Sequence, residues 1–157
     1  MASQVHPADR RRSRLVAAGL SLALIAVLTG CGGSAGTYAQ LSKSAASAGS
    51  PVRSASLALH LEAAGSSLAS ETDTSIQDAI AKVDAVDSSL ATMSLTGAEK
   101  SARDAVLADV RTAEDALLVA LARLSTSRAK YLSASATALA KAAKRLQTLS
   151  DELERRA

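Results

Sequence analysis

Residues 98–157 form a long stretch without helix breakers. After Gly97 the chain runs to Ala157 with neither glycine nor proline, the two residues that most strongly interrupt an α-helix. Apolar residues recur here at intervals of three and four, which places them on one side of a helix. They are Val106, Val110, Ala113, Leu117, Ala120 and Leu124, followed by Tyr131, Ala138, Ala142, Leu146, Leu149 and Leu153. The stretch therefore predicts helix throughout.

This stretch can form one helix or two. A single helix of about 60 residues would be about 90 Å long and would project as a coiled-coil arm. The hydroxyl groups of Ser125, Thr126 and Ser127 offer caps for a separate helix. Arg128 also falls near the middle of the extrapolated apolar stripe, where a charge in a buried seam is costly. We therefore predict a break between residues 125 and 128, with the single arm as the alternative.

Two shorter helices are predicted before Gly97. A turn glycine and a capping box at Thr96–Glu99 separate them from the last stretch. Thr74 with Gln77, or Ser75 with Asp78, offers a capping box for the second helix, whose apolar stripe is Ile76, Ile80, Val83, Val86, Leu90 and Met93. The first helix begins at Pro51, with the stripe Leu57, Leu61, Ala64 and Leu68. A second apolar flank at Leu107, Leu118 and Leu121 favours two neighbours for the third helix. The predicted fold is an all-α antiparallel bundle of three to four helices.

Aromatic residues are almost missing from the chain. It has no Phe or Trp, and its aromatic residues are Tyr38 and Tyr131. The core must therefore consist of Ala, Leu, Val and Ile. With so few aromatic residues, we expect no aromatic-lined pocket. Sugars and many cofactors bind by stacking on such rings, so no cofactor is predicted.

The N-terminus carries an export pattern. Arg10, Arg11, Arg12 and Arg14 precede an apolar run at residues 15–28, which ends in Leu28-Thr29-Gly30-Cys31. A run of about 14 residues is shorter than the roughly 20 that a membrane span needs, and it fits a cleaved leader. Cys31 is the only cysteine, so an intramolecular disulfide is impossible.

The Leu28–Cys31 pattern resembles the lipobox of bacterial lipoprotein signal peptides. The resemblance implies diacylation of the Cys31 thiol, cleavage before Cys31, and a mature chain held on a membrane by its N-terminus. The expected location is the outer face of the plasma membrane, or the outer membrane if the cell has two. The expected organisation is a signal peptide at 1–30, the lipidated cysteine and a flexible Gly/Ser/Ala tether at 31–50, and a helical bundle at 51–157.

Charge is balanced once the leader is set aside. The whole chain has 18 basic and 15 acidic residues, but four of the arginines and Asp9 lie in the leader. The mature chain therefore carries equal numbers of each, which gives no reason to expect a nucleic-acid partner.

The two charge signs are separated along the mature chain. The charged residues between 62 and 115 are mostly acidic, whereas residues 116–150 contain basic residues and no acid. Four of the basic residues fall within about 100° on a helical wheel, opposite Leu139 and Leu146: Lys130, Lys141, Lys144 and Arg145. Three interpretations remain open. This face can be solvated and complement acidic helices of the bundle, contact anionic lipid or acidic envelope polymers, or bind an acidic protein.

No catalytic constellation is predicted. His60 is the only histidine of the mature chain, which leaves no base for a serine nucleophile. Asp84 and Asp87 lack the Glu-x-x-His pairs of a bundle di-metal site, so no metal site is predicted. Asp87 and Arg128 lie near apolar stripes, and a buried ion pair between them is a hypothesis.

The expected function follows from these features. We expect a lipid-anchored, extracytoplasmic, non-enzymatic helical protein with a binding or structural role. The alternative is a spacer or envelope scaffold that self-associates through a long C-terminal coiled-coil helix. The oligomeric state is left open.

Overall fold

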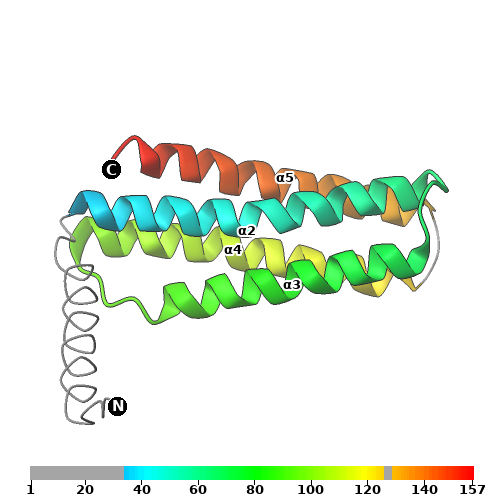
Figure 1. Ribbon diagram of the computed structural model, residues 1–157, viewed down its shortest axis with the longest axis horizontal. Helices are drawn as coiled ribbons and strands as arrows, with labels where there is room; N and C mark the ends of the chain where they lie inside the picture. The colour runs from blue at the N-terminus through cyan, green and yellow to red at the C-terminus, as the bar shows by residue number, and fades with distance from the viewer. Residues whose placement is uncertain (1–33, 126–128) are drawn as a thin grey trace, which may run out of the picture. The chain divides into compact units, whose positions relative to one another are not determined.

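Four α-helices make up the part of the chain that the structure describes. The structure is a computed structural model that describes residues 34–125 and 129–157. The helices are α2 (Ser34–Ala63), α3 (Ala69–Ala91), α4 (Gly97–Leu124) and α5 (Ala129–Glu154), and each runs antiparallel to the preceding one (Figure 1). They pack in the ring order α2, α3, α4, α5, and α2 also contacts α4 across the centre. The predicted all-α antiparallel bundle is confirmed.

The C-terminal stretch forms two helices. α4 ends at Leu124 and α5 begins at Ala129, and the two pack against each other. The predicted break is confirmed, and the single arm of about 90 Å is not formed. Arg128 itself lies outside the described residues.

The start of the bundle differs from the prediction. Residues 34–50, expected to be flexible, form the first half of α2, and its Leu41, Ala45 and Ala48 are completely buried. Alanine has the highest helix propensity, and serine is tolerated in a helix, so this Ala/Ser composition is compatible with helix once a partner covers one side. The bundle therefore begins at Ser34 instead of Pro51.

Pro51 lies inside α2 and does not begin it. The apolar stripe predicted for this helix is also wrong, because Leu57, Leu61 and Leu68 are exposed. The buried side of α2 consists mostly of smaller residues, and Val52 and Leu59 are its larger members after Leu41. The helix turns its small residues inward because they allow its neighbours to approach closely.

The α2–α3 and α3–α4 connections each adjoin a glycine with positive φ. Gly65, with φ of 71°, follows the end of α2, and Gly97, with φ of 55°, begins α4 as predicted. Thr96 is the N-cap residue of α4 but makes no side-chain capping bond. α3 begins at Ala69, before the predicted caps, and Thr74 instead donates a hydrogen bond to the Ser70 carbonyl at 2.9 Å.

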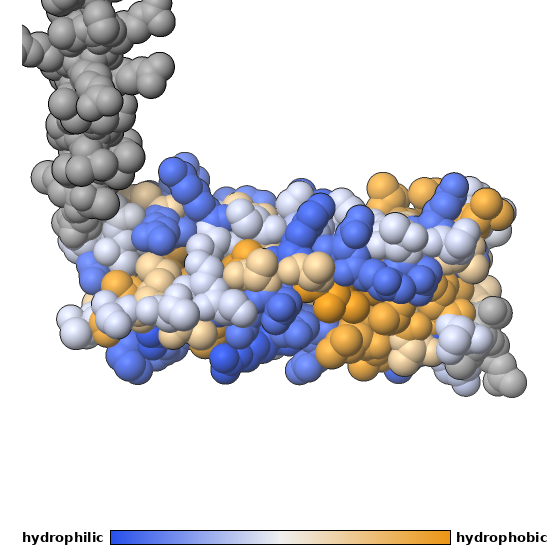
Figure 2. All heavy atoms as spheres, turned by 60° about the horizontal axis from the view of Figure 1, so that its bottom comes forward, coloured by the Kyte–Doolittle hydropathy of each residue, from blue (hydrophilic) through white to orange (hydrophobic). Residues whose placement is uncertain are grey.

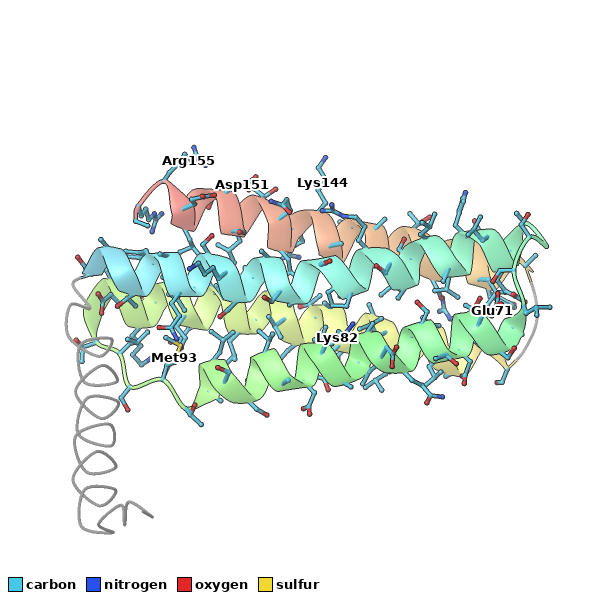
Figure 3. The ribbon with its side chains drawn as sticks, in the orientation of Figure 1. Glu71, Lys82, Met93, Lys144, Asp151 and Arg155 are labelled. Atoms are coloured by element: carbon cyan, nitrogen blue, oxygen red, sulfur yellow. The ribbon has the colours of Figure 1, made fainter. Side chains whose placement is uncertain are left out.

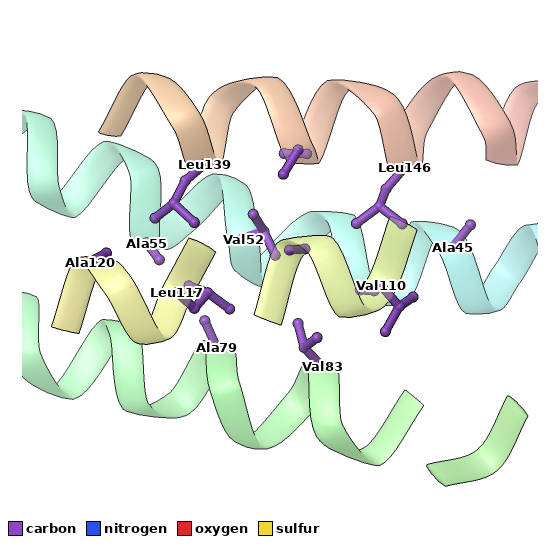
Figure 4. Packing of buried hydrophobic residues seen from close by; sticks show 14 of the residues in the cluster. Ala45, Val52, Ala55, Ala79, Val83, Val110, Leu117, Ala120, Leu139 and Leu146 are labelled. Carbon is purple, nitrogen blue, oxygen red and sulfur yellow. The ribbon is translucent and has the colours of Figure 1, made fainter. Parts of the chain in front are cut away.

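The core runs along the bundle between all four helices. Every residue of the stripe predicted for α4 is buried: Val106, Val110, Ala113, Leu117, Ala120 and Leu124. Figure 4 shows Leu139 and Leu146 of α5 pointing into the core, with Leu117 close to Ala79 of α3. The buried hydrophobic residues are Ala, Val, Ile and Leu, as the composition predicts.

The apolar stripe of α5 was only partly correct. Ala142, Leu146 and Leu153 are buried, but Tyr131 and Ala138 are exposed. Leu132 and Leu139 take the buried positions in the first turns of α5.

Candidate binding face

The four predicted basic residues lie on one exposed side of α5. Lys130, Lys141, Lys144 and Arg145 are all exposed, and Leu139 and Leu146 on the opposite side are completely buried. Figure 3 shows Lys144 projecting away from the other helices. No acidic residue interrupts α5 before Asp151.

Arg145 differs from the three lysines because it has a partner in the bundle. Its Nη2 lies 2.5 Å from Oδ1 of Asp109 on α4. The pair closes one side of a surface groove of about 520 Å³ that Lys141, Lys144, Thr148, Leu149 and Glu152 also line. The interpretation that the basic residues of α5 complement an acidic helix of the same bundle therefore holds for Arg145.

The three lysines remain available to a partner. Within the described ranges, Lys130, Lys141 and Lys144 make no ion pair with an acidic side chain. From Lys130 to Lys144 the helix advances 14 residue steps, which corresponds to about 21 Å along its axis. A row of unpaired cations of this length can contact an extended anionic surface.

The fold adds residues of α2 to this face. α2 lies beside α5: the Ser56 hydroxyl donates to the Ala136 carbonyl at 2.7 Å, and the Ser150 hydroxyl donates to the Ser42 carbonyl at 3.0 Å. Lys43 and Arg53 of α2 are exposed, and no acidic residue precedes Glu62 in this helix. We call the exposed basic residues of these two neighbouring helices the basic face: Lys43, Arg53, Lys130, Lys141, Lys144 and Arg145. Arg145 lies at its edge toward α4, beside Asp109. Sequence reasoning missed the α2 residues because the contact between the first and last helices is tertiary.

The other two helices carry the opposite charge. Their basic residues are Lys82, Lys100, Arg103, Arg111 and Arg123. Their acidic residues are twice as numerous: Glu71, Asp73, Asp78, Asp84, Asp87, Glu99, Asp104, Asp109, Glu114 and Asp115. α3 contacts α2 and α4 but not α5. α2 and α5 together carry six basic and four acidic residues, the acids being Glu62, Asp151, Glu152 and Glu154. Basic residues therefore predominate on the side formed by α2 and α5, which we call the basic side, and acidic residues on the side formed by α3 and α4, the acidic side.

Ion pairs on the acidic side join neighbouring residues and helices. Asp87 of α3 accepts a hydrogen bond from Nε of Arg111 on α4 at 2.8 Å, and this bond raises the pKa of Arg111. Asp87 is thus paired with Arg111 at the surface. The hypothesis of a buried pair between Asp87 and Arg128 is not supported at the Asp87 end, and Arg128 is outside the described residues.

Asp104 has two cationic partners. Lys100 donates to it at 2.8 Å, and Nη2 of Arg103 donates at 2.7 Å. Hydrogen bonds from Lys100 and then Arg103 lower the pKa of the Asp104 carboxyl. Arg103 also donates to the Met93 carbonyl, which ties the connection between α3 and α4 to the α4 helix.

The remaining candidate residues give no further site. His60 lies exposed near the end of α2. In residues 34–125 and 129–157, no group of three or more His, Cys, Asp or Glu side chains is arranged to hold a metal ion. Over the same ranges, no helix has both the length and the hydropathy to cross a bilayer. Cys31 and the leader lie outside the described residues.

Comparison of the chain with protein-family models, curated proteins and solved structures finds no match.

Proposed function

We propose that this chain is an exported bacterial lipoprotein whose mature form begins at a diacylated Cys31. The bundle acts outside the cytoplasm as a non-enzymatic binding or structural module. It is held on the outer face of the plasma membrane, or on the outer membrane in a cell with two membranes. Its partners are anionic, through the lysines of the basic face.

The spacing between Leu28-Thr29-Gly30-Cys31 and the bundle carries this proposal. α2 begins at Ser34, and the first completely buried apolar residue is Leu41. Cleavage before Cys31 therefore leaves all the buried residues of the four described helices in the mature chain. Only Gly32 and Gly33 separate the proposed lipid site from the first residue of α2, so the lipid would hold the bundle close to the bilayer.

A labelling experiment tests the lipid anchor. The full chain is expressed in a bacterium that receives an alkyne-tagged fatty acid, and the tag is detected on the purified protein. We expect the wild-type chain to be labelled and to fractionate with membranes. Cys31→Ala should lose the label, because it has no thiol to acylate. Ser34→Ala, three positions away, is the matched control and should be labelled like wild type. Equal labelling of Cys31→Ala and wild type would refute the proposal.

A self-associating scaffold is the second candidate. Figure 2 shows apolar side chains gathered at the end of the bundle where α2 meets α3 and α4 meets α5. Leu68, Leu118 and Val119 are exposed at this end. Such a patch favours association with another protein surface. Sedimentation of residues 31–157 distinguishes the candidates, since a monomer at all concentrations excludes the scaffold.

A further inference from the structure

We propose that the basic face lies against the surface of an anionic lipid bilayer, with the axes of α2 and α5 parallel to the membrane. The inference deepens the proposed function by naming the partner and the side of the bundle that meets it. Its place in the cell rests on that proposed function, but the affinity for lipid does not require the anchor and can be tested without it.

Charge complementarity is the first step. Lys130, Lys141 and Lys144 are exposed and make no ion pair within the described residues, so their charges are free to meet lipid phosphates. Each basic residue near an anionic leaflet contributes separately to the free energy of binding, and the contributions add. Lys43 and Arg53 extend the same charge onto α2.

The distribution of acidic residues gives the contact a direction. Residues 34–61 and 129–150 contain no acidic residue. Asp109 of α4 and Glu152 line the groove beside Lys141 and Lys144, but Asp109 is paired with Arg145. The acidic residues of α3 lie away from α5, because α3 contacts α2 and α4 but not α5. An anionic bilayer therefore attracts one side of the bundle and repels the other.

Exposed leucines on α2 supply an apolar contribution. Gly49 packs against α5, and Arg53, Leu57 and Leu61 follow it at intervals of four residues. Each such step turns about 40° around the helix, from the α5 contact toward solvent. Leu57 is 61% exposed and Leu61 42% exposed. Leucine side chains beside lysine and arginine on an acid-free surface are typical of segments that lie in a membrane interface.

The position of the anchor is compatible with this orientation. Three residue steps separate Cys31 from Ser34, so the chain between them spans at most about 10 Å. A lipid on Cys31 thus holds the beginning of α2 at the bilayer surface. Because α2 is one of the two helices of the basic face, an anchor at its beginning allows the bundle axis to lie parallel to the membrane surface.

Vesicle binding of the unlipidated chain tests the inference. The protein is residues 31–157 with Cys31→Ser, which retains every core residue. The vesicles are equimolar phosphatidylglycerol and phosphatidylcholine, with pure phosphatidylcholine as the neutral reference. We expect binding to the anionic vesicles that weakens as salt is raised, and little binding to the neutral ones. Binding to both alike would overturn the proposal by showing that charge does not direct the contact. No binding to the anionic vesicles at low salt would overturn it in favour of a carboxylate-bearing protein or polymer.

Matched double variants locate the contact. Lys141→Gln with Lys144→Gln should weaken binding about 30-fold, since each cation near an anionic surface is worth roughly a factor of five. Lys82→Gln with Lys100→Gln removes the same charge from α3 and α4 and should leave binding nearly unchanged. Figure 3 shows Lys82 on α3 and Lys144 on α5. Equal losses in both variants would mean that net charge alone drives binding, and the face would be rejected.

A second pair of variants tests the apolar part. Leu57→Ala should weaken binding about threefold at every salt concentration, because burial of apolar area does not depend on salt. Leu118→Ala, a leucine of α4 that is 47% exposed, is the control and should bind like the parent chain. A loss confined to Leu118→Ala would place the bilayer contact on α4 instead.

Orientation can be read directly, because the Cys31→Ser chain has no other cysteine. An environment-sensitive dye is attached at Ser133→Cys on α5 or at Ser88→Cys on α3, both exposed positions. On anionic vesicles the dye at 133 should shift to the blue, and the dye at 88 should not. A shift at 88 alone refutes the orientation. Fatty-acid labelling of Cys31 is a separate measurement, so a failed anchor and a failed face give different results.

Discussion

The α2–α5 and α3–α4 contacts are built from different side chains. Where α2 meets α5, the α2 residues are small: a Cβ placed on Gly49 would lie 3.4 Å from Cβ of Leu146, and serine hydroxyls reach carbonyl oxygens of the facing helix. Between α3 and α4 the buried residues include Ile76, Val83 and Val106, and an ion pair joins the helices at the surface.

The difference shows that a segment rich in Gly, Ser and Ala can be either a flexible tether or one side of a close helix–helix contact. In isolation they are typical of a flexible tether, since they bury little area. Beside a partner helix they allow two backbones to approach so closely that hydroxyl groups bond across the interface. Aliphatic side chains keep α3 and α4 together through apolar area instead. The α2–α5 contact (the α2–α5 seam) therefore depends on how closely the two helices fit together. The α3–α4 contact depends on the amount of apolar surface removed from water.

Leu41→Ala gives the largest expected effect and tests whether residues 34–50 belong to the bundle. Leu41 is completely buried in the hydrophobic core. Its truncation should lower the free energy of unfolding by about 3 kcal/mol, as for other buried leucines. The measurement is denaturant unfolding of residues 31–157, followed by circular dichroism.

The exposed Lys43, two residues along the same helix, supplies the control. Lys43→Ala should change stability by less than about 0.5 kcal/mol. If Leu41→Ala were equally neutral, residues 34–50 would be the flexible tether that composition predicts, and the α2–α5 seam would be shorter than described.

Gly49 tests whether the α2–α5 seam depends on fit. A Cβ there lies at ordinary contact distance from Leu146, and alanine favours helix over glycine by up to about 1 kcal/mol. Gly49→Ala should therefore be neutral or stabilising. Gly49→Val adds methyl groups that must displace α5, and it should be about 2 kcal/mol less stable than the alanine variant.

Ala46, an exposed residue of α2, supplies the control. Ala46→Val measures how much stability valine loses in this helix where no neighbouring helix is displaced. Ala46→Val should lose less than about 1 kcal/mol, which is the difference in helix propensity. Thermal unfolding of the four chains gives the comparison. A stable Gly49→Val variant would show that α5 can move away freely, and that the seam is not close-packed.

Much of the fold was predictable where helices have unbroken stripes of large aliphatic residues. The α4 stripe was correct throughout because no glycine or proline disturbs it. The α2 stripe was wrong because the sequence pattern favours large residues such as Leu57 and Leu61, whereas the close seam requires small ones. The α5 stripe failed at Tyr131 and Ala138 because it was extended across a helix boundary, and a new helix sets its own phase.

The candidate site was predictable only within one helix. A helical wheel places Lys130, Lys141, Lys144 and Arg145 together, because they share α5. It cannot add Lys43 and Arg53, since nothing local indicates that the first helix lies beside the last. The pairing of Arg145 with Asp109 likewise depends on how α4 meets α5.

The smallest expected effect concerns Asp104, on the acidic side of the bundle. Hydrogen bonds from Lys100 and Arg103 lower the pKa of Asp104 in the folded state, so folding favours the ionised carboxylate. The resulting stability is present above the unfolded-state pKa, about 3.9, and is lost as the pH falls through the lower folded-state pKa. Asp104→Asn should therefore lose less stability than wild type between pH 5 and strongly acidic conditions, by a small amount because the pair is exposed. Unfolding curves over this range measure the difference, and Lys100→Gln should reduce the acid sensitivity in the same direction. Identical curves for Asp104→Asn and wild type would show that the ion pairs of Asp104 do not contribute to folding.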